Sequence, residues 1–241
     1  MLRYLFCVVS ARDAPDLEGW TGAGAPLALV RADGLAGVVG AVAEEQFGSE
    51  ALSRALHDVA AISPYATMHQ DVVQFVFERT PSVVPITFGS VHDSDDDVRR
   101  SLERERARLI ALLERFRERQ EWGLRLARRR ARVPVAAGEP GAGTTYLASR
   151  RAELRGELAS EAKRVADELD RALAAVSLER RDMTEAGGDL ILRTAYLVSS
   201  SEVERVKRIV LQSGERLERT GLGAELSGPW PPYSFVDLAA P

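Results

Sequence analysis

The stretch VVPITFGSVHDSDDDVR, residues 83–99, decides how the first half of this chain folds. A short β-branched run ends at Pro85, passes through Phe88 and Gly89, and leads into an acidic cluster that begins a long charged helix. Ser94 can cap the first turn of that helix, and the aspartates lie at the positive end of its dipole. We therefore expect Pro85, Phe88 and Gly89 to be structural, shaping the way a strand meets a helix.

The helix that begins near Asp95 carries one apolar stripe among Glu and Arg residues. The stripe consists of Val98, Leu102, Leu109, Leu112, Leu113 and Phe116. We expect Phe88 to be buried against the first of these residues, Val98 and Leu102.

The segments before this stretch complete an α+β domain, which we expect to cover residues 1–119. In the first strand, simple alternation places Leu2, Tyr4, Phe6 and Val8 on one face and Leu5, Cys7 and Val9 on the other. Two later apolar runs are separated by Asp33-Gly34, which predicts a hairpin. Helical spacing then begins at Ser49 and returns from Met68 to Phe77.

Residues 120–241 start a second pattern, which ends in an aromatic and proline-rich tail. Its expected elements are a strand at 121–129, a variable surface loop at 131–143, a long amphipathic helix over 154–176, strands at 177–183 and 189–198, a helix after Ser200, and a strand at 224–230. The order β-α-β-β-α-β is that of a modified ferredoxin-like domain. The chain is therefore predicted to be α+β with two domains.

Composition narrows the class of protein. The chain has 241 residues, is 45% hydrophobic and 28% charged, and has a net charge of −4, all of which are typical of a globular protein. Its arginines are interleaved with acidic residues, so we expect no nucleic-acid partner. Cys7 is the single cysteine and suits a reducing cytoplasm. No segment has the roughly 18 apolar residues of a membrane span, so we also expect no lipid-membrane partner and a cytoplasmic location.

The residues that could bind a metal do not have the spacing that a metal site needs. A calcium loop counted from Asp93 would require Gly and Glu where Val98 and Arg104 stand. The three histidines, His57, His69 and His92, lie at no zinc-ligand spacing. We therefore expect no metal.

The residues that could act in catalysis or hold a cofactor are no more convincing. Ser90, His92 and Asp93 are near neighbours on one segment, and such neighbours rarely form a catalytic triad. The glycine-rich stretch 22–26 has no helix terminus after it, and 138–143 contains a proline and follows no convincing buried strand. Neither stretch has a Walker lysine. We expect no catalytic residue and no cofactor.

The tail segment GPWPPYSF, residues 228–235, has a different character. Its three prolines stiffen the backbone, so Trp230, Tyr233 and Phe235 lose little entropy on docking. We expect Trp230, Pro232, Tyr233 and Phe235 to clamp the tail onto the ferredoxin-like domain, with the N-terminal half as a second candidate. The alternative is that they form a contact for a partner protein.

Several of these motifs together resemble the gas vesicle accessory proteins of the GvpF/GvpL family. In chain order they are YLFCVV (4–9), ATMHQDVVQ (66–74), VVPITFGSV (83–91), EWGLRLA (121–127), GTTYLASRR (143–151) and GPWPPYSF (228–235). The resemblance implies two α+β domains, the second a modified ferredoxin-like fold. It also implies a location at the gas vesicle and a non-enzymatic role in building this hollow shell from a small hydrophobic subunit.

The partners that the resemblance implies are the shell subunit and other gas vesicle accessory proteins. Such a subunit has to be held in solution until it joins the wall, and open sheet edges or helix grooves can provide the contact. The alternative function is a small-molecule sensor or enzyme built on the ferredoxin-like half, since that fold hosts many activities. A deep polar pocket with an acidic side chain beside a histidine would favour the alternative.

Overall fold

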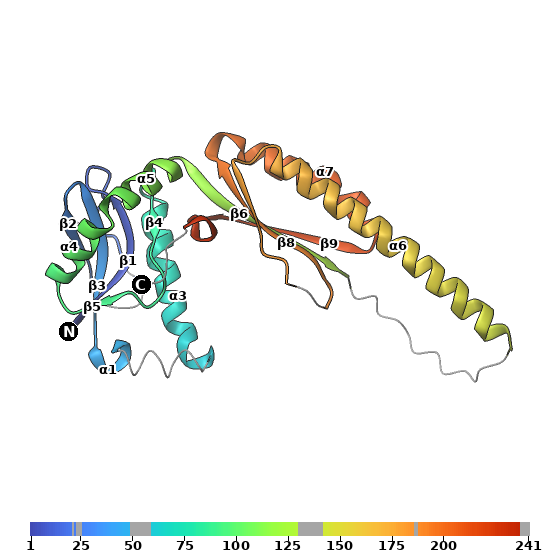
Figure 1. Ribbon diagram of the computed structural model, residues 1–241, viewed down its shortest axis with the longest axis horizontal. Coiled ribbons are helices and arrows are strands. Elements are labelled where there is room, and N and C mark those ends of the chain that lie inside the picture. Colours follow the sequence, from blue (N-terminus) through green and yellow to red (C-terminus); the bar gives the residue numbers. More distant parts are fainter. Residues whose placement is uncertain (21, 23–25, 49–58, 130–141, 186–187, 237–241) are drawn as a thin grey trace. The chain divides into compact units, whose positions relative to one another are not determined.

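The structure is a computed structural model that describes residues 1–20, 22, 26–48, 59–129, 142–185 and 188–236. The chain forms two compact units (Figure 1). Unit 1 contains Met1–Gln120 together with the tail from Pro229, and unit 2 contains Glu121–Gly228. Each unit combines helices with an antiparallel sheet, so the α+β prediction is confirmed.

Unit 1 is built on a five-stranded sheet in the order β2-β3-β1-β4, with β5 also paired to β1. Its strands are β1 (Leu2–Ser10), β2 (Leu27–Ala32), β3 (Leu35–Val42), β4 (Val84–Pro85) and β5 (Val91–His92). Its helices are α1 (Glu44–Phe47), α3 (Val59–Phe77), α4 (Asp95–Arg104) and α5 (Arg106–Phe116), followed after unit 2 by a short 3-10 turn, η2 (Tyr233–Phe235). The expected Asp33-Gly34 hairpin is confirmed between β2 and β3, and both turn residues have positive φ, 42° and 85°.

The central strand β1 departs from simple alternation. Its register against β3 shifts between Leu5 and Cys7, which is a β-bulge at Phe6. As a result, Phe6 and Cys7 both join the core cluster that contains Tyr4 and Val9. The expected grouping of Cys7 and Val9 with Leu5 was therefore wrong, because an extra residue in the strand resets the alternation.

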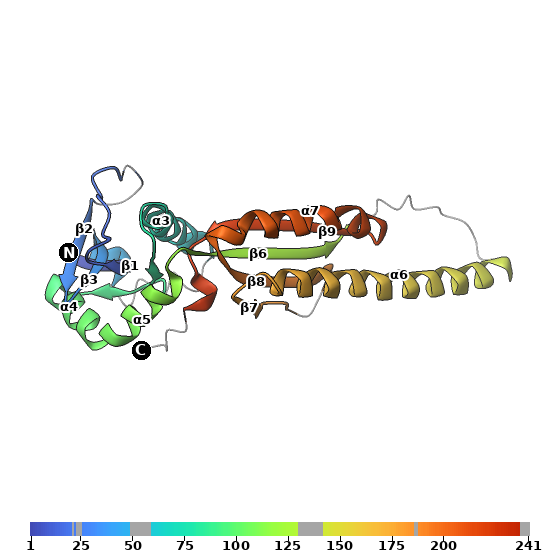
Figure 2. The ribbon, with the colours of Figure 1, turned by 90° about the horizontal axis from the view of Figure 1, so that it is seen from above.

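Helices cover both faces of the unit 1 sheet (Figure 2). On one face, Val72, Val73 and Val76 of α3 pack in the cluster that contains Tyr4 and Phe6. On the other face, α4 brings Val98 and Leu102 against Leu5, close to Gly37 of β3. A side chain at position 37 would come within 2.9 Å of Leu5 Cδ1, so a glycine permits this close packing.

The helix expected from Asp95 begins where predicted and is divided in two. Ser94 caps it as predicted: its Oγ accepts a hydrogen bond from the Asp97 backbone N–H at 3.2 Å and donates one to the Asp97 carboxylate at 2.7 Å. The helix ends at Arg104, and α5 continues from Arg106 after a break at Glu105. The apolar stripe continues across the break. Its spacing therefore predicts the helical periodicity but not the interruption at Glu105.

Unit 2 has a four-stranded sheet in the order β7-β8-β6-β9. Its elements are β6 (Arg119–Arg128), α6 (Ala142–Ala174), β7 (Glu179–Asp182), β8 (Leu190–Ser199), the turn η1 (Ser200–Glu202), α7 (Val203–Arg219) and β9 (Leu222–Trp230). The first and third strands of the unit lie side by side in the middle, as expected for the ferredoxin-like βαββαβ order. Both helices pack on one face, where Trp122, Leu126, Leu169 and Val206 belong to a single core.

Parts of two expectations lie outside the described residues. They are the helix predicted from Ser49, up to residue 58, and the variable loop predicted at 131–143, up to residue 141. At its end this loop meets α6, which already begins at Ala142. Among the helices that the structure describes, none is long and apolar enough to cross a membrane.

Candidate functional site

Three of the sequence motifs meet at the side chain of Tyr4. Tyr4 is fully buried, and its hydroxyl lies 3.0 Å from Nδ1 of His69 on α3. The same hydroxyl accepts a hydrogen bond of 2.9 Å from the backbone N–H of Gly89. Gly89 has a φ of 89°, in the left-handed region where a glycine is favoured. One phenol therefore ties the first strand to α3 and to the connection that follows β4.

Phe88 packs beside this pair rather than on the helix stripe. Its ring centroid is 6.2 Å from that of Tyr4 and 5.8 Å from that of His69, and it is half-buried. The expectation that Phe88 is buried against Val98 and Leu102 was wrong. Phe88 joins the core cluster on the α3 side of the sheet, whereas those two residues pack on the other side.

The C-terminal tail packs into unit 1. Phe235 is 1% exposed, and its carbonyl oxygen accepts a 3.4 Å hydrogen bond from Arg115 on α5. The Tyr233 ring is 6.3 Å from the His69 ring. Pro232 is buried, and Trp230 is half-buried at the end of β9. Of the two places expected for the clamp, the observed contacts are those with the N-terminal half, and the tail belongs to unit 1.

Ring contacts extend from Tyr4 into an aromatic cluster on the α3 side of the sheet. Its members are Tyr4, Phe6, Phe47, Tyr65, His69, Phe88 and Tyr233. Burial lowers the pKa of His69 to about 4, partly opposed by the nearby backbone of Ile86, and burial raises the pKa of Tyr4 to about 12, partly opposed by the hydrogen bond from Gly89. Both side chains are therefore neutral at pH 7 and stabilise the core as hydrogen-bonding groups.

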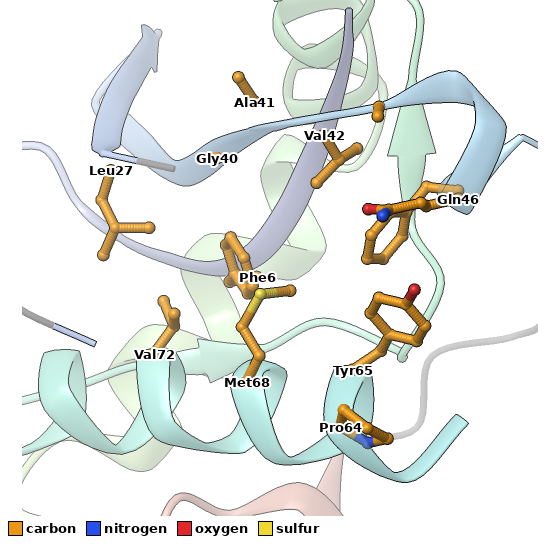
Figure 3. Close-up of a pocket in the computed structure, with 12 residues that line it drawn as sticks. Phe6, Leu27, Gly40, Ala41, Val42, Gln46, Pro64, Tyr65, Met68 and Val72 are labelled. Atoms are coloured by element: carbon orange, nitrogen blue, oxygen red, sulfur yellow. The ribbon is translucent and has the colours of Figure 1, made fainter. Parts of the chain in front are cut away.

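An apolar groove opens at one end of this cluster, between β3, α1 and α3 (Figure 3). It has a volume of about 310 Å³, and none of the described side chains that line it carries a charge. Met68 and Val72 project from α3 toward Phe6, and Tyr65 lies opposite Gln46. Sequence reasoning missed the groove, although one signal was present. The small residues Gly40 and Ala41 near the end of β3, and Ala43 just after it, line the groove where larger side chains would fill the space.

The remaining polar candidates that the structure describes are not arranged as a catalytic triad or a metal centre. Ser90 Oγ is 3.3 Å from Nε2 of His92, but no hydrogen bond or ion pair joins His92 to Asp93, the third member of the candidate triad, in the described part of the chain. The nearby Asp97 carboxylate is engaged with Ser94 and Arg100 in the helix cap. Among the described residues, no group of His, Cys, Asp or Glu side chains is arranged to hold a metal ion. Cys7 is buried, and burial raises the pKa of its thiol well above its ordinary value. His57 lies outside the described residues.

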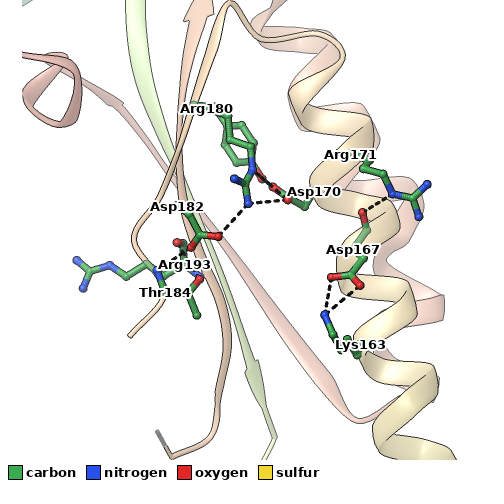
Figure 4. A network of polar contacts seen from close by, with 9 residues as sticks. Lys163, Asp167, Asp170, Arg171, Arg180, Asp182, Thr184 and Arg193 are labelled. Carbon is green, nitrogen blue, oxygen red and sulfur yellow. Dashed lines mark hydrogen bonds and ion pairs between the residues drawn. The ribbon is translucent and has the colours of Figure 1, made fainter. Parts of the chain in front are cut away.

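Unit 2 contains a separate polar network between α6 and the edge strand β7 (Figure 4). The Nε of Arg180 donates to both oxygens of Asp170, at 2.9 and 3.0 Å, and its Nη2 lies 3.2 Å from Asp182. Tyr196 donates to Asp170 at 2.5 Å. The network fastens β7 to the helix layer, and each charged group has a partner within it, so it stabilises the fold rather than offering a vacant site.

The comparisons with known proteins agree with each other over the whole chain. A family model described as gas vesicle synthesis protein GvpL/GvpF matches residues 2–237. Gas vesicle protein L of Streptomyces sp. (strain CB03234) is 30% identical over 255 residues, covering 99% of this chain and 94% of that protein.

Two solved structures share the fold. The crystal structure of the gas vesicle protein GvpF from Anabaena sp. PCC7120 matches with a TM-score of 0.69 at 14% identity and covers 99% of both chains. That of GvpF from Microcystis aeruginosa matches with a TM-score of 0.68 at 15% identity, covering 98% of this chain and 99% of that chain.

Proposed function

Since this chain belongs to the GvpL/GvpF family of gas vesicle synthesis proteins, we propose that it is a non-enzymatic assembly factor. It binds the small hydrophobic shell subunit, and other accessory proteins, while the vesicle is nucleated or grows. It works in the cytoplasm and at the vesicle, through protein–protein contact, without nucleic acid, lipid membrane or cofactor.

The apolar groove of unit 1 is the observation that carries this proposal. Its walls are aliphatic and aromatic, and Gln46 and the Tyr65 hydroxyl are the side-chain polar groups at its lining. Burying one Leu- or Ile-sized side chain removes apolar surface from water and is worth about 1.5–3 kcal/mol. A groove of about 310 Å³ with this lining therefore favours the binding of an apolar segment of a partner. Its described residues offer no opposite charge to a charged segment.

The position of the groove supports the same role. Phe6 and Phe47 line it, and they also belong to the aromatic cluster that the Tyr4 hydrogen bonds hold in place. A rigid apolar wall binds a partner at low entropic cost, because little has to be ordered on binding. The alternative of a sensor or enzyme called for an acidic side chain beside a histidine in a polar pocket, and among the described residues neither type of side chain lines this groove.

A charge placed in the groove tests the proposal. Met68→Asp puts a carboxylate in the lining of the groove, whereas Thr67→Asp puts the same charge on the preceding residue of α3, which is exposed. Each variant is co-expressed with the shell subunit and recovered by affinity pull-down. We expect the wild type and Thr67→Asp to retain the subunit, and Met68→Asp to lose it while still unfolding at a temperature close to that of the wild type.

Two results would contradict the proposal. If the wild-type chain retains neither the shell subunit nor another vesicle accessory protein, the assembly role is wrong. If Met68→Asp and Thr67→Asp retain the subunit equally, the groove is not the contact surface.

A further inference from the structure

The strand β2 forms an open edge of the unit 1 sheet, and its backbone is positioned to accept another strand. Asp33 and Gly34 make a two-residue turn, so the flanking pair Ala32 and Leu35 is the hydrogen-bonded pair that closes the hairpin. Alternation along the ladder then leaves the N–H and C=O groups of Leu27, Leu29 and Arg31 pointing away from β3. In the part of the chain that the structure describes, these outward groups make no backbone hydrogen bond.

The edge lacks the features that usually protect such strands. Its register against β3 is unbroken, so no bulge turns the edge away. Arg31 is the one charged residue of β2, and its guanidinium donates to the carbonyl of Ala11 at 2.8 Å. An edge of this kind is a template for strand addition unless something covers it.

A hollow of about 550 Å³ runs beside the open edge. Leu27, Ala28 and Leu29 line one side of it, and the segment from Pro15 to Trp20 lines the other. The Nε1 of Trp20 is buried and has no hydrogen-bond acceptor among the described residues. A buried N–H without an acceptor is costly, so the hydrogen-bonding capacity of this wall of the hollow is not fully satisfied among the described residues.

Leu27 joins this hollow to the apolar groove, because it lines both. We propose that β2 is a strand-addition site that receives an extended segment from another protein, with apolar residues at alternate positions. The side chains that face α3 enter the hollow and the groove. The inference rests on the proposed function, under which that segment belongs to the shell subunit. Asp16 and Glu18 border the hollow, so a Lys or Arg would be favoured at the end of the added segment that lies beside these two carboxylates.

A second copy of this chain fits the edge less well. If two β2 strands paired, Leu27 and Leu29 of each copy would lie at the contact. Both side chains already pack on the core of their own chain, so neither would fill the hollow of the other copy. Two six-residue strands also bury far less than the roughly 1,000 Å² that a stable interface needs.

Backbone hydrogen exchange of the wild-type chain, alone and with the purified shell subunit, tests the proposal directly. Strand addition slows exchange at the outward amides of Leu27, Leu29 and Arg31. It leaves the amides of Ala28, Val30 and Ala32 unchanged, because β3 already protects them. Uniform slowing over the whole strand, or none, would overturn strand addition.

A pair of substitutions at one position tests the same point by affinity. Leu29→Pro removes an outward N–H, and an edge strand tolerates this loss, whereas Leu29→Ala keeps the N–H and removes only side-chain atoms. We expect Leu29→Pro to weaken subunit binding by about tenfold or more and Leu29→Ala to weaken it by about threefold.

The outcomes separate this inference from the proposed function. If the subunit binds folded Leu29→Pro as tightly as the wild type but is lost from Met68→Asp, strand addition is wrong and the assembly role stands. If the wild type alone is a dimer that Leu29→Pro converts to a monomer, a second copy occupies the edge and the inference is wrong. If Leu29→Pro does not fold, the hydrogen-exchange pattern of the wild type decides.

Discussion

Tyr4 joins three separate segments of unit 1 through one hydroxyl. The phenol is fully buried. Its hydroxyl forms a hydrogen bond with Nδ1 of His69 and accepts a second one from the backbone N–H of Gly89. Removing the hydroxyl would leave both groups without that partner inside a core of low polarity, where an unmade hydrogen bond costs more than it does in water.

We predict that Tyr4→Phe lowers the free energy of unfolding by about 1–3 kcal/mol. Tyr65→Phe removes a hydroxyl at the rim of the groove and should cost less than about 0.5 kcal/mol. Urea unfolding followed by circular dichroism measures both variants. Equal losses in the two variants would show that the Tyr4 hydroxyl has no special role.

His69 should make the stability of the protein depend on pH. Burial lowers its pKa to about 4 in the folded state, whereas the unfolded chain has an ordinary value near 6.5. The unfolded state therefore takes up the proton first as the pH falls. The contribution of His69 is complete above about pH 6.5 and declines between pH 6.5 and 4, by up to about 3 kcal/mol.

We expect the unfolding free energy of His69→Gln to be lower at pH 7 and to change less than that of the wild type between pH 6.5 and 4. The carboxylates titrate in both proteins, so the difference between the two pH profiles of unfolding free energy isolates the contribution of His69. Parallel pH profiles for the two proteins would mean that His69 ionises equally in the folded and unfolded states.

At the scale of elements, the edge strand β7 depends on a polar latch rather than on apolar burial. All four of its residues are charged, and most of the strand is exposed. Arg180 holds the strand to α6 through the mostly buried Asp170, which Tyr196 also contacts. Charged edge residues also discourage pairing with other chains, so β7 differs from β2 in this respect.

We predict that Arg180→Met speeds hydrogen exchange at the β7 amides and costs about 1–3 kcal/mol, because Asp170 loses a bidentate partner. The control is Lys163→Gln, which removes an exposed pair with Asp167 on the same helix. It should change stability by less than about 0.5 kcal/mol. Unchanged β7 exchange in Arg180→Met would rule out the latch.

At the scale of the whole molecule, unit 1 is completed by a segment that follows unit 2 in the chain. The chain leaves unit 1 after Gln120, builds unit 2, and returns at Pro229. Phe235 then fills a place in the unit 1 core, and Arg115 binds its carbonyl oxygen. Unit 1 therefore needs the segment that begins at Pro229 in order to be fully packed.

We expect Phe235→Ala to destabilise the protein by about 3–5 kcal/mol, the usual cost of deleting a buried phenylalanine ring. Hydrogen exchange should accelerate in unit 1, at α5 and α3, and stay unchanged at β8 of unit 2. Val236→Ala, at the half-buried next residue, is the matched control and should cost less than about 1 kcal/mol. Acceleration confined to unit 2 would mean that the tail stabilises the ferredoxin-like unit instead.

The sequence by itself determined those features that depend on neighbouring residues. Apolar spacing identified α6 and the α4–α5 stripe, Ser94 marked a helix start, and Asp33-Gly34 marked a hairpin. The order of elements in unit 2 indicated its sheet, and the ordered motifs indicated the family that the comparisons confirm. Each of these signals lies within one turn, one helix or one strand, or in the order of such elements.

Only the tertiary structure decided what depends on packing between distant segments. One extra residue at Phe6 changes which side chains face α3, and no periodic pattern shows such a bulge in advance. The meeting of Tyr4, His69, Gly89 and Tyr233, and the groove beside Met68, arise where segments far apart in the chain are brought together. Such contacts form because the sheet and its helices bury their apolar faces together, and that burial is a property of the folded surface rather than of any one segment.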